Sequence, residues 1–454
     1  MSQSQEASDA AREVALGAIT VEDATALVRA LVDIPSPTGQ ERDCAVYLQR
    51  YMEASGVEVR LQELEAGRAN VVAAVRGAGS GPTLMLNGHL DTTHYGDEAE
   101  DYAVLGTPRP NDRPQSFELD GSIYGLGAFN MKGGVAAIFL ALRALHQAGV
   151  RLSGHVLASG VVGESEKAPV RGTARDYAGS RYRGAGWGTR YLLMHCDPID
   201  YAIVAEPSDL YVANAQAGYL FVKIVIRGRS SFLSTRGSQG SAPGVSAVEE
   251  AVEVVRAVNH WGETYAERHV YDTGMGVITP FVTVGAIDGG WPFFPTIVPG
   301  ICHVYVNLRV TPAMTGPQAL GELDACLREL GRHRPGLRYE LEVFASNVPS
   351  TITPADSLLC LTGVAVMEER LGLPTRPFGP GEADPSNDTN VFRRHGIPAI
   401  KCGPKTRLEP NASNSLRQHG PHVHRDDIVV AARFYVHMAF ELCGRSRAEP
   451  QASR

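Results

Sequence analysis

The sequence predicts an α/β protein in which a mostly parallel sheet, with helices on both faces, is interrupted by a smaller α+β domain. Up to residue 213, short apolar strand patterns alternate with helical patterns, which is typical of a parallel sheet covered on both faces. From about residue 214 to residue 344 the order changes to β-α-β-β-α-β, which is typical of a ferredoxin-like unit. We therefore expect residues 1–213 and 337–454 to form one domain and residues 214–336 to form a second, inserted domain.

The first part of the chain is assigned from its periodicity. Apolar residues three or four positions apart, such as Leu27 and Leu31, predict helices. These helices span residues 21–32, 39–53 and 135–148, and short apolar runs predict strands at 57–61, 70–75, 83–86, 155–162 and 201–204. We expect a frayed start over residues 1–19 and a long loop over 95–122. Residues 167–191 are expected to be either a functional loop or partly disordered.

The second part is assigned in the same way. Strands are predicted at residues 219–228, 277–288, 302–310 and 338–344, with helices at 245–258 and 315–330. A helix at 357–371, a strand at 399–403 and a terminal helix at 427–444 return the chain to the first domain. The strand at 338–344 fits either domain, so the end of the inserted domain stays open between these alternatives.

Composition limits the classes of function. A net charge of −8 gives no reason to expect nucleic-acid or membrane binding, and no apolar run is expected to span a membrane. Seven scattered cysteines without a C-x-x-C pair indicate neither a disulfide framework nor a structural zinc knuckle. The polar first twenty residues lack the pattern of a signal peptide. We expect a cytoplasmic protein whose partner is a small molecule.

Two glycine-bearing segments place polar side chains where strands end. His89 and Asp91 follow an apolar strand, and the run Gly125–Gly134 precedes a helix. Open α/β sheets place their sites at such strand ends. A histidine can bind a metal ion through one ring nitrogen while a nearby carboxylate orients the ring. These residue types therefore predict a metal or catalytic site.

The segments "NGHLDT" and "GLGAFNMKGG" resemble the metallopeptidase superfamily of aminoacylase, acetylornithine deacetylase, succinyl-diaminopimelate desuccinylase and glutamate carboxypeptidase. The resemblance implies a catalytic domain interrupted by a lid that also serves dimerisation, and hence a homodimer. It also implies zinc at His89. In the family an Asp bridges two zinc ions, and Asn130 stands at its place here. A neutral amide lacks the charge that two close cations need, so Asn130 predicts a weakened dinuclear centre, or a hydrogen bond beside a single metal and the substrate.

The Gly163–Lys167 segment has two alignments with the family. Without gaps, Glu164 takes the place of the general base and Ser165 that of a metal-binding Glu. A bulged turn would let Glu166 replace Ser165, and a one-residue slip would make Glu164 the ligand. We favour the alignment without gaps, which makes Glu164 the base. A Glu in such a pocket can have a raised pKa, which suits a group that acts as both acid and base on a water.

Further positions follow from the resemblance. Glu206, in Ala205-Glu206-Pro207, corresponds to a metal ligand, and Arg309 to a lid arginine that pairs with a substrate carboxylate. Phe232 replaces the lid histidine that stabilises the oxyanion, with Arg229 or Arg236 as a replacement donor. Asp388 and Gly403 keep the pattern of a segment that lines the substrate pocket, and Lys405 there would favour an anionic substrate.

The last family ligand is a histidine shortly before the terminal helix. Its expected place falls near Arg417, so His419 is the nearest candidate. His422 and His424 are the other two candidates for this ligand, and their alternative role is to cap the helix.

Two functions follow from these residues. The first is a metal-dependent amide hydrolase that acts on a small N-acyl amino acid or peptide with one or two zinc, cobalt or manganese ions. The second is a degenerate relative that binds a ligand or performs non-hydrolytic chemistry. The departures at Asn130, Ser165, Phe232 and Arg417 favour the second, because they fall on site positions. The retained histidine and carboxylates favour the first.

Overall fold

The structure is a computed structural model that describes residues 3–106, 108–172, 177–232, 244–346, 349–382, 385–405, 407 and 420–446. Its larger sheet has six strands, and the ends of three of them carry the candidate site. In spatial order they are β1 (Glu58–Glu65), β2 (Arg68–Val75), β6 (Val156–Val161), β3 (Leu84–His89), β7 (Tyr201–Val204) and β18 (Ala399–Lys401). The four strands from β6 to β18 are parallel, while β1 and β2 run antiparallel at one edge. The sheet is therefore mostly parallel, as predicted.

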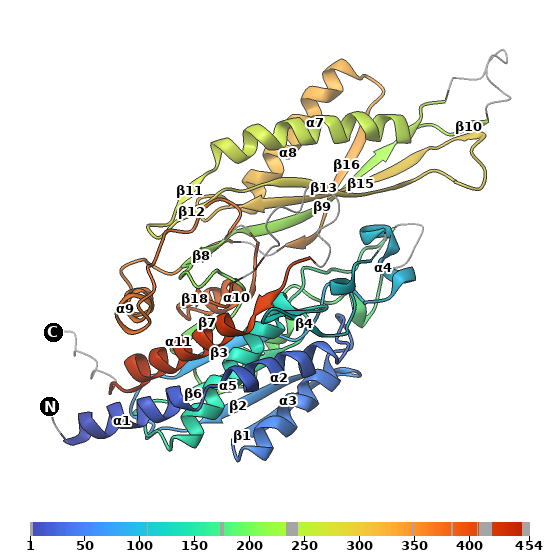
Figure 1. Cartoon of the computed structure of the whole chain (residues 1–454). Coiled ribbons are helices and arrows are strands. Elements are labelled where there is room, and N and C mark those ends of the chain that lie inside the picture. Colours follow the sequence, from blue (N-terminus) through green and yellow to red (C-terminus); the bar gives the residue numbers. More distant parts are fainter. Residues whose placement is uncertain are drawn as a thin grey trace, which may run out of the picture.

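Helices cover both faces of this sheet (Figure 1). Side chains alternate between the two faces along β2, and both faces are apolar. Val71 and Ala73 join one buried apolar cluster, while Val72 and Ala74 join another on the opposite face. The first cluster takes helices α1 (Gln3–Gly17), α2 (Val21–Val32), α3 (Arg42–Ala54), α5 (Gly133–Gln147), α9 (Leu358–Ala365) and α11 (Arg425–Cys443). The second takes α6 (Trp187–Met194) and α10 (Asp388–Arg394).

Helix α5 lies at the centre of the first cluster. The segment Ala128–Gln147 is long and apolar enough to cross a membrane, contrary to the sequence-based expectation. However, 89% of its most apolar window is buried inside the protein. Packing against the sheet and against α11 and α2 accounts for this composition, so the segment has the character of a core helix.

The second sheet is antiparallel and carries two helices on one face. Its elements in chain order are β9 (Gly218–Arg227), α7 (Ala247–Arg268), β13 (Val282–Gly289), β15 (Ile301–Val310), α8 (Gly316–His333) and β16 (Arg338–Ser346). The spatial order of the strands is β13-β15-β9-β16. In Figure 1 this unit lies above the larger sheet, with α7 and α8 on its far side. Because β16 pairs with β9, the unit continues to Ser346, and of the two alternatives for the 338–344 strand the structure shows that it belongs to the second sheet.

Several elements differ from the predictions. Residues 3–17 form helix α1, whose Ala15 is fully buried and whose Arg12 approaches Glu441 at 3.4 Å. The expected loop over 95–122 contains α4 (Glu98–Leu105), which Asp97 caps through two backbone N–H groups. Residues 167–191 contain the start of α6. Helices α4 and α6 have only eight residues each, which is too short for a clear apolar period.

Short elements complete the chain. They are η1 (Pro110–Asp112), β4 (Phe117–Leu119), β5 (Ser122–Tyr124), η2 (Ala128–Lys132), η3 (Ser180–Tyr182), β8 (Ala215–Gln216), β10 (Ser231–Phe232), β11 (Tyr271–Asp272), β12 (Val277–Ile278), β14 (Ile297–Val298), β17 (Thr351–Ile352), η5 (Val366–Arg370) and β19 (Val423–His424). All seven cysteines are free, in agreement with the predicted absence of a disulfide framework.

Candidate metal centre and active site

Three side chains from three parallel strand ends meet in one place. Nε2 of His89, at the end of β3, lies 3.2 Å from Oε1 of Glu206 and 3.8 Å from Oε2 of Glu164. The ligand atoms of these three residues all lie within 4.8 Å of one another. They line a cavity of about 720 Å³. The convergence predicted from the strand ends is therefore confirmed, although 75 and 42 residues (164 − 89, 206 − 164) separate them in sequence.

The hydrogen bonds of His89 define what its ring can hold. Nδ1 lies 2.8 Å from the backbone oxygen of Asp91, and a carbonyl oxygen only accepts, so Nδ1 carries the hydrogen. In a neutral ring Nε2 then presents a lone pair. That lone pair faces Oδ1 of Asn130 at 2.9 Å and Oε1 of Glu206 at 3.2 Å.

Three lone-pair donors that face one another need a cation among them. The cation is either a proton on Nε2 or a metal ion. One imidazole nitrogen together with carboxylate and amide oxygens suits zinc, cobalt or manganese. The residues present therefore fit a metal ion, to which Asn130 would contribute its carbonyl oxygen.

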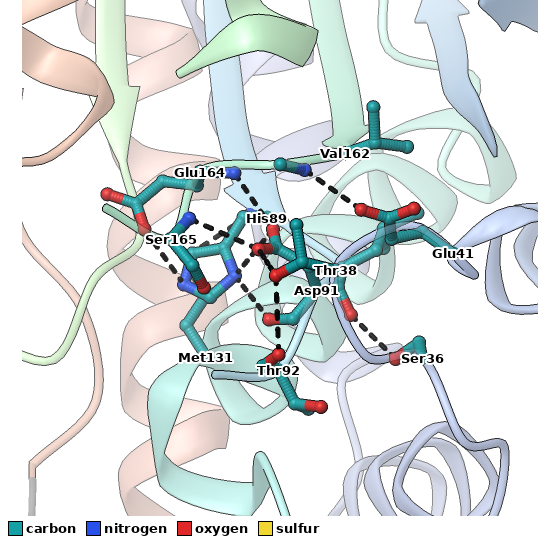
Figure 2. Close-up of polar contacts among 12 residues, drawn as sticks. Ser36, Thr38, Glu41, His89, Asp91, Thr92, Met131, Val162, Glu164 and Ser165 are labelled. Atoms are coloured by element: carbon teal, nitrogen blue, oxygen red, sulfur yellow. Dashed lines mark hydrogen bonds and ion pairs between the residues drawn. The ribbon is translucent and has the colours of Figure 1, made fainter. Parts of the chain in front are cut away.

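Asp91 contacts the His89 ring through both its side chain and its backbone. Its Oδ1 lies 3.5 Å from Nδ1 of His89, and its backbone oxygen lies closer, at 2.8 Å. The carboxylate also accepts the backbone N–H groups of Glu164 at 2.9 Å and Ser165 at 3.1 Å, and the hydroxyl of Thr38 at 3.0 Å. Figure 2 shows Asp91 between His89 and the Glu164–Ser165 turn. Asp91 thus fixes the turn that carries Glu164 relative to the His89 strand.

Burial and neighbouring charges shift the titration of the cluster. Burial opposes the charged ring of His89, but the hydrogen bond to Glu206 and the nearby carboxylates raise its pKa well above the usual value. Burial also raises the pKa of Glu164 well above its usual range, against the opposing charge of His89. The pKa of Asp91 is lowered because His89 and the two N–H donors of the turn outweigh its burial.

A buried ion pair stabilises the turn that carries Glu164. Glu41 and Arg68 are both fully buried, and Nη2 of Arg68 lies 2.7 Å from Oε1 of Glu41. The same oxygen accepts the N–H of Gly163 at 3.1 Å. Arg68 also donates to the backbone oxygens of Ser180 and Arg183. The pair therefore connects the start of α3, β2 and the η3 segment with Gly163, the residue that precedes Glu164.

Two glycines fix the strand end that carries Glu206. A Cβ on Gly403 would meet the backbone oxygen of Ala205 at 2.3 Å, and a Cβ on Gly134 would meet it at 2.1 Å. Only glycine permits both approaches. Gly403, predicted to line the substrate pocket, therefore packs against the Ala205–Glu206 backbone.

The remaining predicted residues lie as follows. Glu166 does not join the cluster, because it pairs with Arg309 of β15, with Nη1 of Arg309 2.5 Å from Oε1. The predicted substrate-carboxylate partner Arg309 is thus engaged by Glu166 in this structure. Ser165 lines the cavity. Phe232, at the predicted position of the lid histidine, is 54% exposed and pairs within the β10–β14 ribbon.

Asp388 and the late histidines lie outside the three-residue cluster. Asp388 is buried at the start of α10, where its Oδ2 accepts the Thr189 hydroxyl at 2.7 Å, and burial raises its pKa to about 6. His419, Arg417 and Arg236 fall outside the described residues. His424 caps α11 by accepting the N–H of Asp426, and His422 packs on the ring of Tyr124.

Sequence reasoning missed part of the cavity wall. Lys167, Tyr211, Phe221, Glu382 and Lys401 line the cavity with the metal candidates. Lys167 stands three residues after Glu164, and this proximity was the one available signal. The other four come from β9, β18 and distant loops, and no local pattern connects them.

The chain matches the model of peptidase family M20/M25/M40 over residues 85–441, and it belongs to this family. This agrees with the resemblance seen in the two glycine-bearing segments.

Curated relatives include enzymes that remove small acyl groups. An N-formyl-4-amino-5-aminomethyl-2-methylpyrimidine deformylase from Halalkalibacterium halodurans is 26% identical, with 81% of this chain and 89% of the relative covered. An acetylornithine deacetylase from Aliivibrio salmonicida is 24% identical, with 76% and 85% covered. Together with the family, these relatives identify a hydrolase of carbon–nitrogen amide bonds. None of them supports the alternative of a non-hydrolytic protein.

Solved structures show the same fold. A tripeptidase from Staphylococcus aureus superposes with a TM-score of 0.67 at 16% identity, with 94% of this chain and all of that chain covered. A dinuclear metal-binding peptidase of the M20 family from Bacillus subtilis gives a TM-score of 0.60 at 14% identity, with 93% and 98% covered.

Proposed function

We propose that the protein hydrolyses the amide bond of a small N-acyl amino acid or short peptide, with a divalent metal held by His89, Asn130 and Glu206. The observation that carries this proposal is the geometry of His89. Its Nδ1 donates to the Asp91 carbonyl, which leaves the Nε2 lone pair facing two oxygen donors. A metal ion satisfies all three at once, and the raised pKa of His89 in its absence reflects the same demand for positive charge.

When bound, a divalent ion there supplies Lewis acidity, which polarises a carbonyl and makes water more acidic. Glu164 is the residue placed to move the proton. Its Oε2 lies 3.8 Å from Nε2 of His89, farther than the 3.2 Å of Glu206, so its carboxylate stands beside the donor set. Burial raises the pKa of Glu164, which suits a group that takes a proton from water and returns it to the leaving nitrogen.

Hydrogen bonds from the backbone around Glu164 to two carboxylates fix the position of the Glu164 side chain. Asp91 accepts the N–H groups of both Glu164 and Ser165, and Glu41 accepts that of Gly163. Asp91 therefore acts as a positioning residue, since its carboxylate anchors the turn and its carbonyl orients the His89 ring.

The cavity supports a small substrate. Its volume of about 720 Å³ lies within the usual range for sites that bind small molecules. Two relatives carry the names of a deformylase and a deacetylase, and removal of a small acyl group from nitrogen is the shared chemistry.

The test is a hydrolysis assay on a panel of N-formyl and N-acetyl L-amino acids, read as release of free amine. Zinc-, cobalt- and manganese-loaded protein should hydrolyse at least one member, chelation should abolish the activity, and returning the metal should restore it. Protein that retains its metal but hydrolyses no member of the panel would contradict the proposal. Turnover that survives complete metal removal would do so as well.

A further inference from the structure

The cavity contains one lysine whose ammonium group has no hydrogen-bond partner among the described residues. Lys167 lines the cavity together with His89, Asn130 and Glu164. Its Nζ is shielded from solvent and finds no acceptor in the described part of the chain. No described carboxylate lies within the 4.0 Å that defines an ion pair with it. An ammonium group buried without a counter-ion is unfavourable, so this position calls for an anion.

The other cations near the cavity are already engaged. Lys401 donates to the backbone oxygen of Glu382 at 2.7 Å. Arg309 is paired with Glu166. Lys167 therefore stands apart from these two basic groups as the one placed to receive an anionic group from a ligand.

Backbone hydrogen bonds and an aromatic ring fix the position of Lys167. Its backbone N–H donates to the oxygen of Ser165 at 2.6 Å, and its own oxygen accepts the N–H of Gly184 at 3.1 Å. Nζ lies 4.8 Å from the centre of the Tyr95 ring, a distance at which the ring face attracts a cation. The flexible four-carbon stem allows Nζ to turn from the ring toward the cavity.

Acidic side chains on the cavity wall make a separate cation favourable for binding an acidic substrate. Glu206 and Asp209 line it, and acidic side chains there repel a carboxylate. Lys167 supplies a positive group on the cavity wall that offsets this repulsion.

We propose that Lys167 binds an anionic group of the substrate and gives the protein a preference for N-acyl amino acids with a free α-carboxylate over their neutral amides. This inference rests on the proposed amide hydrolysis for its substrate class. It assigns the recognition of charge to Lys167, whereas the sequence pointed to Arg309 and Lys405.

The experiment compares the wild type with Lys167→Met, Lys167→Arg and the control Lys405→Met. Lys405 is not among the described residues that line the cavity, so its variant removes the same charge from outside it. Each metal-loaded protein is assayed on a panel of N-acetyl L-amino acids and on the matching N-acetyl amino acid amides.

We expect Lys167→Met to raise KM for the carboxylates about 10- to 100-fold, the usual effect of losing a hydrogen bond to a charged group. KM for the amides and the metal content should stay unchanged. Lys167→Arg should retain part of the preference, and Lys405→Met all of it. The unfolding midpoint of Lys167→Met should not fall, because the variant removes an unpaired buried charge. An equal rise in KM for carboxylates and amides, or the same loss in Lys405→Met, would overturn the proposal.

Binding measurements separate this inference from the proposed function. If the metal-loaded wild type hydrolyses nothing, the hydrolase proposal fails, and calorimetric titration with the same two panels then decides on Lys167. Binding of carboxylates but not amides, lost in Lys167→Met, supports the anion site. Binding that ignores the charge, or no binding by any panel member, overturns it.

Discussion

The buried pair of Glu41 and Arg68 gives the sharpest prediction about how the site is held. Both side chains are fully buried, and the guanidinium contacts Glu41 through Nη2 at 2.7 Å and Nε at 2.9 Å. Arg68→Met removes the guanidinium group and leaves the buried carboxyl group of Glu41 without a counter-ion. Breaking one side of a buried ion pair typically costs about 3–5 kcal/mol. Lost hydrogen bonds to the oxygens of Ser180 and Arg183 add to this cost.

The size of the loss should depend on pH. Burial and the charge of Asp91 raise the pKa of Glu41 to about 7 even against the opposing contacts of Arg68. Without Arg68 the folded-state pKa rises further above the unfolded value of 4.5, so the folded protein binds more protons and its stability falls as pH increases. Arg68→Met should therefore lose more stability at pH 8 than at pH 5.5.

The assay is urea unfolding of the wild type, Arg68→Met, Glu41→Gln and the double variant at both pH values. The double variant should be less unstable than the sum of the single variants, since it leaves no uncompensated charge. An Arg68→Met variant within about 1 kcal/mol of the wild type at pH 8 would refute this reasoning, because surface ion pairs contribute that little. Additive losses in the double variant would do the same.

Three further predictions follow from the site and its surroundings. Glu164→Gln should lower kcat about 10²- to 10⁴-fold while metal content stays unchanged, measured on any hydrolysed N-acyl amino acid; unchanged turnover would remove Glu164 as the base. Asn130→Asp combined with Ser165→Glu should raise the zinc retained after gel filtration, because each change adds an anionic oxygen beside the donor set; no rise would show that these residues are misplaced. Burial lowers the pKa of His437 to about 4, so its contribution to stability is present above pH 6.5 and is lost as pH falls toward 4. His437→Leu should flatten that part of the urea stability profile, and an unchanged profile would contradict the assignment.

The sequence was informative where chemistry depends on local spacing. His89 and Asp91 lie two residues apart at the end of an apolar strand, and the glycine-rich segment before α5 contains Asn130. Both segments could therefore be recognised as parts of the site from their local patterns. The alternation of strands and helices predicted the mostly parallel sheet for the same reason. Glu206 could be placed because it follows a short apolar strand within Ala205-Glu206-Pro207, and in the structure that strand pairs with β3.

The features of the site that could not be predicted depend on contacts between segments that are distant in sequence. Glu41 and Arg68 carried no signal in the sequence, since their pairing across 27 positions leaves no local pattern. The split role of Asp91, with its carbonyl on His89 and its carboxylate on the Glu164 turn, could not be seen without backbone geometry. Whether Glu166 takes the place of Ser165 beside the cluster could not be seen from the sequence either, because Glu166 pairs with Arg309 on the second sheet.

The central claim is that His89, Asn130 and Glu206 hold a metal ion. The most direct measurement is zinc per chain by elemental analysis, after incubation with zinc and gel filtration, on the wild type, His89→Ala and the control His260→Ala. His260 lies on the exposed side of α7, far from the cluster in sequence and in fold. We expect about one zinc per chain in the wild type and the control and almost none in His89→Ala, with all three proteins folded by circular dichroism. A folded wild type that retains no zinc, or a His89→Ala variant that retains as much as the control, would contradict the account.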